Sequence, residues 1–221
     1  MIKIRFLCAV IFITLFFVPT SFAATTIETL ANQQILDQAK EKTEIEKVIN
    51  TSKVDPKSFL VEEKDNLDRK ELINVKSPTE LKYGDAYKVI VADSNVEKAL
   101  LNGTDLAIVL EQAPYKWEVP VIYQKELQPV ASFTIDYFNG AWQIVEIGGY
   151  LSPKQSYLSS DSNELTNLWR NKLSLNTADS FFHFRSLSLH SDFLYLATEE
   201  QEYFIPLLHA RDELYLSLIH I

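Results

Sequence analysis

The stretch ASFTIDYF-NG-AWQIVEI, residues 131–147, decides the fold class of this 221-residue chain. Two apolar and aromatic segments flank Asn139-Gly140, a dipeptide that readily supplies the two positive-φ residues of a type I′ turn. Such a turn joins antiparallel strands through a two-residue loop. The sequence therefore predicts a β-hairpin and, with it, an antiparallel sheet.

The two-residue loop fixes the expected register of this hairpin. Three cross-strand pairs are predicted on its bulkier face, which should be the core side: Tyr137 with Trp142, Ile135 with Ile144, and Phe133 with Glu146. Because side chains alternate between faces, Thr134, Asp136 and Gln143 should point the other way. Asp136 and Glu146 would then lie on opposite faces, which argues against a catalytic pair of carboxylates.

Further strands are expected on both sides of the hairpin. β-Branched and aromatic residues are concentrated in residues 86–92, 106–110, 117–123, 181–189, 193–197 and 203–208. Short links between these segments argue against a parallel, doubly wound sheet. Residues 152–162 are polar and loop-like, whereas residues 163–172 predict a short helix.

The N-terminal part of the mature chain, residues 24–53, predicts one long amphipathic helix. Its apolar residues recur mostly at spacings of three and four, without Gly or Pro from residue 26 to residue 50. The apolar stripe should face a sheet or a partner chain. Residues 54–82 carry many charges and few apolar residues, which is typical of a solvated connector that allows a short helix around Lys57–Lys64. The fold class is thus α+β: this helix, an antiparallel sheet of about six or seven strands and one further short helix, with the sheet domain in residues 83–215.

Both ends of the chain carry segments outside this domain. Residues 1–23 are typical of a secretory signal: Lys3 and Arg5 precede a 13-residue apolar run, and small residues precede a cut at Ala23/Ala24. The alternative is an uncleaved anchor, although the run is short for a membrane span. Residues 216–221, LSLIHI, match the translation of a common sequencing adapter. The alternative is an ordinary apolar final strand; with the adapter, the native protein would continue beyond Tyr215.

Composition and charge exclude several classes of function. A formal charge of −9, made more negative by signal cleavage, argues against a nucleic-acid partner, because phosphate binding needs a basic face. The only cysteine, Cys8, lies in the signal segment, so the mature chain has neither disulfide nor thiol nucleophile. We expect a secreted, extracytoplasmic protein with no membrane span after cleavage.

Four short motifs carry a weak resemblance to a known class of proteins. They are Gly84-x-x-Tyr87-Lys88-Val89, Trp117-x-Val119-Pro120-Val121, Asn139-Gly140-x-Trp142 and Gly148-Gly149. Over about residues 83–150 the chain resembles secreted bacterial proteins of unknown function with a cystatin/PepSY-like outline, a helix against a curved sheet. The resemblance implies an interaction module of the bacterial envelope and no catalytic residue.

Candidate catalytic residues lie only near the C-terminus. His190 with Asp192, and His209 with Asp212, could each pair an imidazole with an orienting carboxylate. No Gly-x-Ser-x-Gly elbow accompanies them, and His183, His190 and His209 are expected to be structural. No metal or other cofactor is predicted, because His-Glu-x-x-His is absent and the calcium-loop-like start at Asp93 fails at two ligand positions.

Two functions therefore remain open. The first is a secreted, non-catalytic interaction module that binds another envelope or extracellular protein, either through aromatic strands or through its long helix. The alternative is a secreted hydrolase that uses His190 or His209 and has part of its site beyond Tyr215. The sequence favours the first, because each catalytic constellation lacks an essential member.

Overall fold

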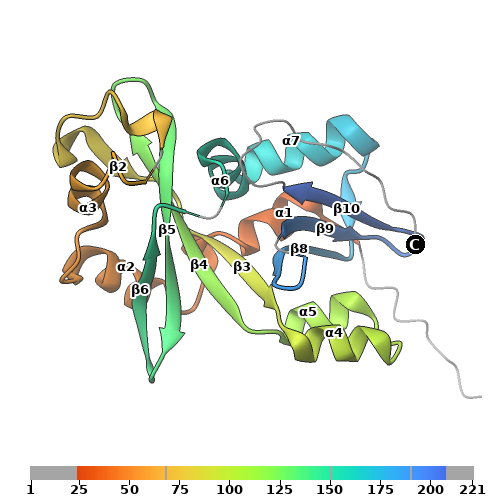
Figure 1. Ribbon diagram of the computed structural model, residues 1–221. Coiled ribbons are helices and arrows are strands. Elements are labelled where there is room, and N and C mark those ends of the chain that lie inside the picture. The colour runs from red at the N-terminus through yellow and green to blue at the C-terminus, as the bar shows by residue number, and fades with distance from the viewer. Residues whose placement is uncertain (1–23, 68, 150, 190, 208–221) are drawn as a thin grey trace, which may run out of the picture.

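The computed structural model describes residues 24–207 except residues 68, 150 and 190 (Figure 1). The signal segment, the adapter-like end, His190, His209 and Asp212 therefore lie outside the described residues. The fold is mixed α+β, as predicted, with one large sheet, a two-stranded sheet and helices packed around them.

The large sheet has the strand order β10-β9-β8-β3-β4-β5-β6. The short strand β2 also pairs with β4, along a different part of β4 from the one that pairs with β3. The strands of the large sheet are β2 (Leu81–Tyr83), β3 (Tyr87–Ala92), β4 (Tyr115–Tyr123), β5 (Gln128–Phe138), β6 (Ala141–Ile147), β8 (Ser180–Ser186), β9 (Ser191–Ala197) and β10 (Glu202–Leu207). All pairs are antiparallel except β3 with β8, which is parallel. A small antiparallel pair joins β1 (Thr25–Thr26) to β7 (Thr177–Ala178).

The prediction of a single long N-terminal helix was wrong. The segment forms α1 (Ile27–Gln33), a 3-10 turn (Leu36–Gln38) and α2 (Lys42–Thr51). Between the helices, Ile35 forms a bridge with Tyr87, and the Leu36 N–H donates to the carbonyl oxygen of Ala86. The apolar stripe also serves two different clusters, with α1 packed against α7 and β8 and α2 against β6. Tertiary pairing with the sheet thus outweighs local helix propensity.

Residues 54–82 are not a solvated connector. They form α3 (Pro56–Glu62), two 3-10 turns (Lys70–Leu72 and Pro78–Glu80) and β2. Apolar side chains of this segment reach the core: Leu60, Leu72 and Val75 are fully buried. A charged surface therefore covers a segment that is anchored in the main apolar cluster.

Two predicted elements have the wrong type. Residues 106–110 belong to a helix, α5 (Leu106–Gln112), which follows α4 (Ser94–Leu101). The Asp105 side chain accepts the Ile108 N–H, so it is the N-cap of α5. The expected loop at 152–162 contains α6 (Pro153–Ser160), with Ser152 as N-cap and Pro153 in its first turn. Each missed helix thus carries a recognisable start signal. The helix predicted at 163–172 is confirmed and corresponds to α7 (Ser162–Leu173).

The β5–β6 hairpin has the predicted turn, with φ of 53° at Asn139 and 83° at Gly140. The pairs Tyr137 with Trp142 and Ile135 with Ile144 are confirmed. The predicted pair of Phe133 with Glu146 was wrong, because a bulge shifts the register and places Glu146 opposite Thr134. Asp136 and Glu146 therefore share a face of the sheet, contrary to the sequence prediction.

Burial along the hairpin changes towards its tip. Phe133 and Ile135 are fully buried in the cluster that α2 and α3 cover. Trp142 is only half-buried and Tyr137 is 56% exposed, so the predicted core pair at the tip is partly solvated. Thr134 was predicted to point away from the core face of the hairpin. It is nevertheless buried, because α6 packs against β4 and β5 on the side opposite α3 in Figure 1.

Candidate functional site

A buried network of charged side chains surrounds Asp192, one of the four candidate catalytic residues. The Asp192 side chain is fully buried on β9, and its register partner on β8 is Arg185. It contacts His183, whose Nε2 lies 3.0 Å from Asp192 Oδ2. Among the candidates, only Asp192 can thus be placed, and it lies inside the protein.

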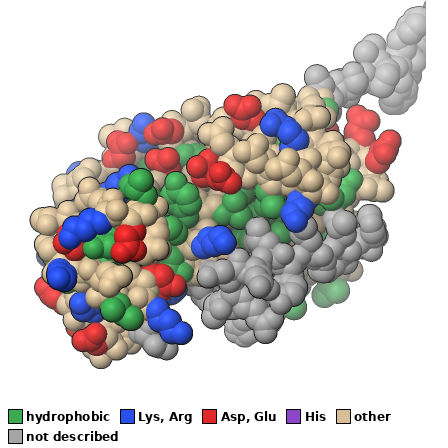
Figure 2. Space-filling view, turned by 90° about the horizontal axis from the view of Figure 1, so that it is seen from above, with side chains coloured by type: hydrophobic (Ala, Val, Ile, Leu, Met, Phe, Trp, Pro, Cys, Tyr) green, Lys and Arg blue, Asp and Glu red, His purple; other side chains and the backbone are tan. Residues whose placement is uncertain are grey.

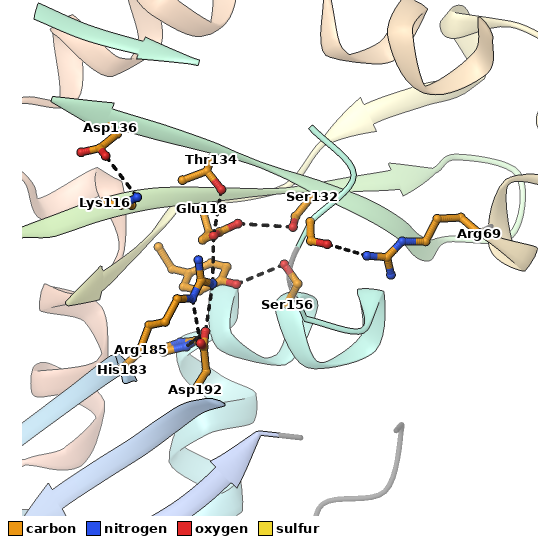
Figure 3. Close-up of polar contacts among 12 residues, drawn as sticks. Arg69, Lys116, Glu118, Ser132, Thr134, Asp136, Ser156, His183, Arg185 and Asp192 are labelled. Carbon is orange, nitrogen blue, oxygen red and sulfur yellow. Dashed lines mark hydrogen bonds and ion pairs between the residues drawn. The ribbon is translucent and has the colours of Figure 1, made fainter. Parts of the chain in front are cut away.

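Arg185 is the centre of this network (Figure 3). Its Nε donates to Asp192 Oδ1 at 2.8 Å, and its Nη2 donates to Asp192 Oδ2 at 3.0 Å. The same Nη2 donates to Glu118 Oε1 at 3.1 Å. Glu118, on β4, also accepts hydrogen bonds from the hydroxyl groups of Ser132 and Thr134 on β5. One guanidinium thus links strands β4, β8 and β9.

The two carboxyl groups respond differently to this environment. Burial raises the pKa of Glu118, and the attraction of Arg185 does not offset it. Burial also opposes ionisation of Asp192, but hydrogen bonds from His183 and Arg185 outweigh it and lower the pKa of Asp192. The difference follows from the donors: Asp192 is bonded by two nitrogens of Arg185 and by His183, whereas Glu118 receives one bond from the guanidinium and two from neutral hydroxyl groups.

The geometry of His183 does not fit a catalytic base. Its ring stacks on Tyr87, with centroids 5.3 Å apart, and both side chains are buried. Tyr87 in turn donates to the Ser156 hydroxyl at 3.2 Å. His183 Nδ1 has no hydrogen-bond partner within the described part of the chain, so no serine hydroxyl lies in position for activation. The described residues also include no group of three or more metal-ligand side chains.

A cleft of about 620 Å³ lies at the hairpin tip, where the sheet surface reaches solvent. Its aromatic walls are Tyr115 at the start of β4, Tyr137 on β5 and Trp142 on β6. Trp142 lies 5.9 Å from Tyr115 and 5.3 Å from Tyr137, measured between ring centroids. Glu41, Asp136 and residues 112–114 complete the lining. Aromatic walls with a few polar neighbours are the usual composition of a ligand site.

The charged groups around this cleft are already paired. The Tyr115 hydroxyl donates to Glu41, and Lys88 Nζ lies 4.3 Å from the centroid of the Tyr115 ring. Asp136 forms an ion pair with Lys116 at 3.1 Å. Because Lys116 balances Asp136 and Lys88 attracts Glu41, the cleft is close to neutral in an otherwise acidic protein. Figure 2 views the molecule from above, away from the hairpin tip, and shows acidic and basic side chains interspersed on that face.

Sequence reasoning missed both features. The signal for the network was a single charge inside an apolar strand: Glu118 lies between Trp117 and Val119, and Arg185 follows Phe184. The signal for the cleft was an aromatic pair placed beside a hairpin turn, where the sheet ends. No pattern along the chain links Glu41 to that turn, because their proximity is created by the packing of α2 against β6.

Comparisons with models of known families, with curated proteins and with solved structures give no match. The resemblance of residues 83–150 to secreted proteins with a cystatin/PepSY-like outline therefore stays a prediction. Among the described residues, no helix has the length and apolar character needed to cross a membrane.

Proposed function

We propose that this protein is a secreted, non-catalytic binding module whose ligand occupies the cleft of Tyr115, Tyr137 and Trp142. The observation that carries the proposal is the cleft itself. Three aromatic rings converge at the hairpin tip, and the outermost, Tyr137, is more than half exposed. Large exposed aromatic side chains grouped beside polar ones are characteristic of interaction sites.

The buried network supports the non-catalytic part of this proposal. A catalytic acid or base must reach substrate within hydrogen-bond distance, whereas Asp192 and His183 are shielded from solvent. Their bonds hold strands together instead. A hydrolase built on His190 or His209 stays the alternative prediction, and it depends on residues outside the described part of the chain.

Secretion rests on the sequence of residues 1–23 and is tested separately. When the full chain is expressed in a bacterial host, the secreted product should begin at Ala24. A membrane-bound product that retains residues 6–18 would show that the segment is an anchor.

Binding is tested by a thermal-shift panel of oligosaccharides, peptides and anionic polymers on the mature protein. At least one class should raise the melting temperature, and Tyr137→Ala should abolish that shift. Phe138→Ala is the matched control, because Phe138 is 58% exposed on the neighbouring position of the same strand but does not line the cleft. No stabilising class, or one that Tyr137→Ala leaves unaffected, would refute the cleft as the site. Turnover of ester, peptide or glycoside substrates would refute the non-catalytic assignment.

A further inference from the structure

The aromatic rings of the cleft are tilted relative to one another and do not form a flat platform. The planes of Tyr137 and Trp142 are 67° apart, and those of Tyr115 and Trp142 are 40° apart. A pyranose ring has an apolar C–H face that packs on an aromatic face and a rim of hydroxyl groups that form hydrogen bonds. Rings tilted towards one another can contact successive residues of a twisted, soluble sugar chain.

The polar groups of the cleft suit hydroxyl partners better than charged ones. Lys88 attracts Glu41, and Lys116 is paired with Asp136, so a cationic ligand would have to compete with a lysine at each carboxylate. Each carboxylate retains acceptor capacity, because an ionised carboxylate offers about four lone-pair sites. A sugar hydroxyl can use these sites without displacing the cation.

A second groove continues the cleft and increases its length. This groove of about 340 Å³ lies along α4 and α5 and shares Gln112, Ala113 and Pro114 with the aromatic cleft. Its lining includes Asn95, Thr104 and Ile108, the last of which is 51% exposed. The combined trough suits a linear chain of several units rather than a monosaccharide.

A peptide strand fits this place less well. The simplest peptide mode adds a strand to an exposed sheet edge, and β6 is the edge strand beside the cleft. The register shift between the pairs Ile135–Ile144 and Thr134–Glu146 places an extra residue, Val145, in that strand. Bulges of this kind twist an edge away from further pairing.

We infer that the trough formed by the aromatic cleft and the α4–α5 groove binds a neutral, soluble oligosaccharide chain. This inference rests on the proposed binding function and names its ligand class. Tyr115, Tyr137 and Trp142 supply the stacking surfaces, and Ile108 contacts the distal units.

Isothermal titration of the mature protein with neutral hexasaccharides tests the inference directly. Cellohexaose, laminarihexaose, mannohexaose and chitohexaose are the probes, with their disaccharides as the short-chain series. At least one hexasaccharide should bind, and its disaccharide should bind at least about tenfold more weakly. Tyr137→Ala should weaken hexasaccharide binding about tenfold or more, the loss typical of a central aromatic contact, while Phe138→Ala should leave it within about twofold.

A variant at the distal end tests the length of the site. Ile108→Ser should weaken hexasaccharide binding and leave disaccharide binding unchanged, since only the longer chain reaches α5. Equal losses for both lengths would overturn the extended trough.

The failure of this inference is distinguishable from failure of the proposed function. Hexalysine and heparin are titrated in parallel as a cationic peptide and a polyanion. If one of these binds in a Tyr137-dependent manner and no hexasaccharide does, the binding module stands and the ligand class is wrong. If no probe of any class responds to Tyr137→Ala, both proposals fail.

Discussion

The buried network and the aromatic cleft use the same kinds of side chain in opposite ways. In the network, Glu118, Asp192 and Arg185 are removed from water, and their donors and acceptors are turned towards one another. In the cleft, Glu41 is bonded to the Tyr115 hydroxyl and Asp136 is paired with Lys116, but these contacts lie beside partly exposed rings. The two sets of charged groups differ in their access to water. The buried set holds strands together, and the accessible set can still bind a ligand.

The energetic consequence of this difference is large. Removing one partner of a buried pair leaves an uncompensated charge in a medium of low polarity. Removing one partner of a solvated pair leaves a charge that water stabilises. The following predictions test that contrast.

Arg185→Met should have the largest effect, a loss of about 3–5 kcal/mol in unfolding free energy, because Glu118 and Asp192 would lose their shared cation. Urea unfolding followed by circular dichroism measures this loss. A variant that does not fold at all agrees with the prediction. A loss below about 1 kcal/mol would mean that the network is hydrated and that its bonds are not structural.

Trp117→Ala and Trp142→Ala compare buried and half-buried rings of one cluster. Trp117 is fully buried, so its truncation should cost about 3–5 kcal/mol. Trp142 keeps part of its surface in water, and its truncation should cost about 2 kcal/mol. The same urea measurement applies to both variants. Equal costs would contradict the partial exposure of Trp142 on which the cleft depends.

Glu118 should make stability depend on pH. Its pKa is raised in the folded state, so the folded protein binds a proton that the unfolded chain releases above about pH 4.5. Its contribution is therefore fully present below pH 4.5 and is lost as pH rises towards the folded pKa, with a slope of at most about 1.4 kcal/mol per pH unit. Asp192 has a lowered pKa, and its contribution is lost only below about pH 3.8.

The variant Glu118→Gln isolates this dependence. The amide keeps a hydrogen-bond acceptor for Arg185 but does not titrate. Unfolding free energies measured from pH 4.5 upwards should decline in the wild-type protein and decline less in the variant. Identical profiles would assign the titration to another group.

The contrast between the two regions also shows what sequence patterns can and cannot predict. The hairpin turn, two of its three pairs and most strands follow from local signals, because Asn139-Gly140 and alternating apolar residues act over short distances. The break after α1 does not follow from its apolar spacing, since it depends on pairing between Ile35 and Tyr87. The bulge at Val145 is equally invisible, and it alone reverses the relation between Asp136 and Glu146.

The sites are harder to predict than the fold for the same reason. Asp192 was a candidate because His190 lies two residues away, yet its partners are His183 and Arg185 across the β8–β9 ladder. Alternate residues of one strand lie on the same face of the sheet. The register of the neighbouring strand then decides which of its side chains contact them.

Lys116→Met should have the smallest effect and completes the comparison with Arg185→Met. Lys116 and Asp136 form an ion pair in which both side chains are about one-third exposed. Loss of the cation should cost less than about 1 kcal/mol, because water solvates the remaining carboxylate. The difference from wild type should shrink further when the salt concentration is raised to about 1 M, where charges are screened over about 3 Å. Urea unfolding at low and high salt measures both quantities. A loss of unfolding free energy above about 2 kcal/mol that does not depend on salt would show that this pair is as shielded from water as the Arg185 network. The distinction between a buried network and an accessible cleft would then be wrong.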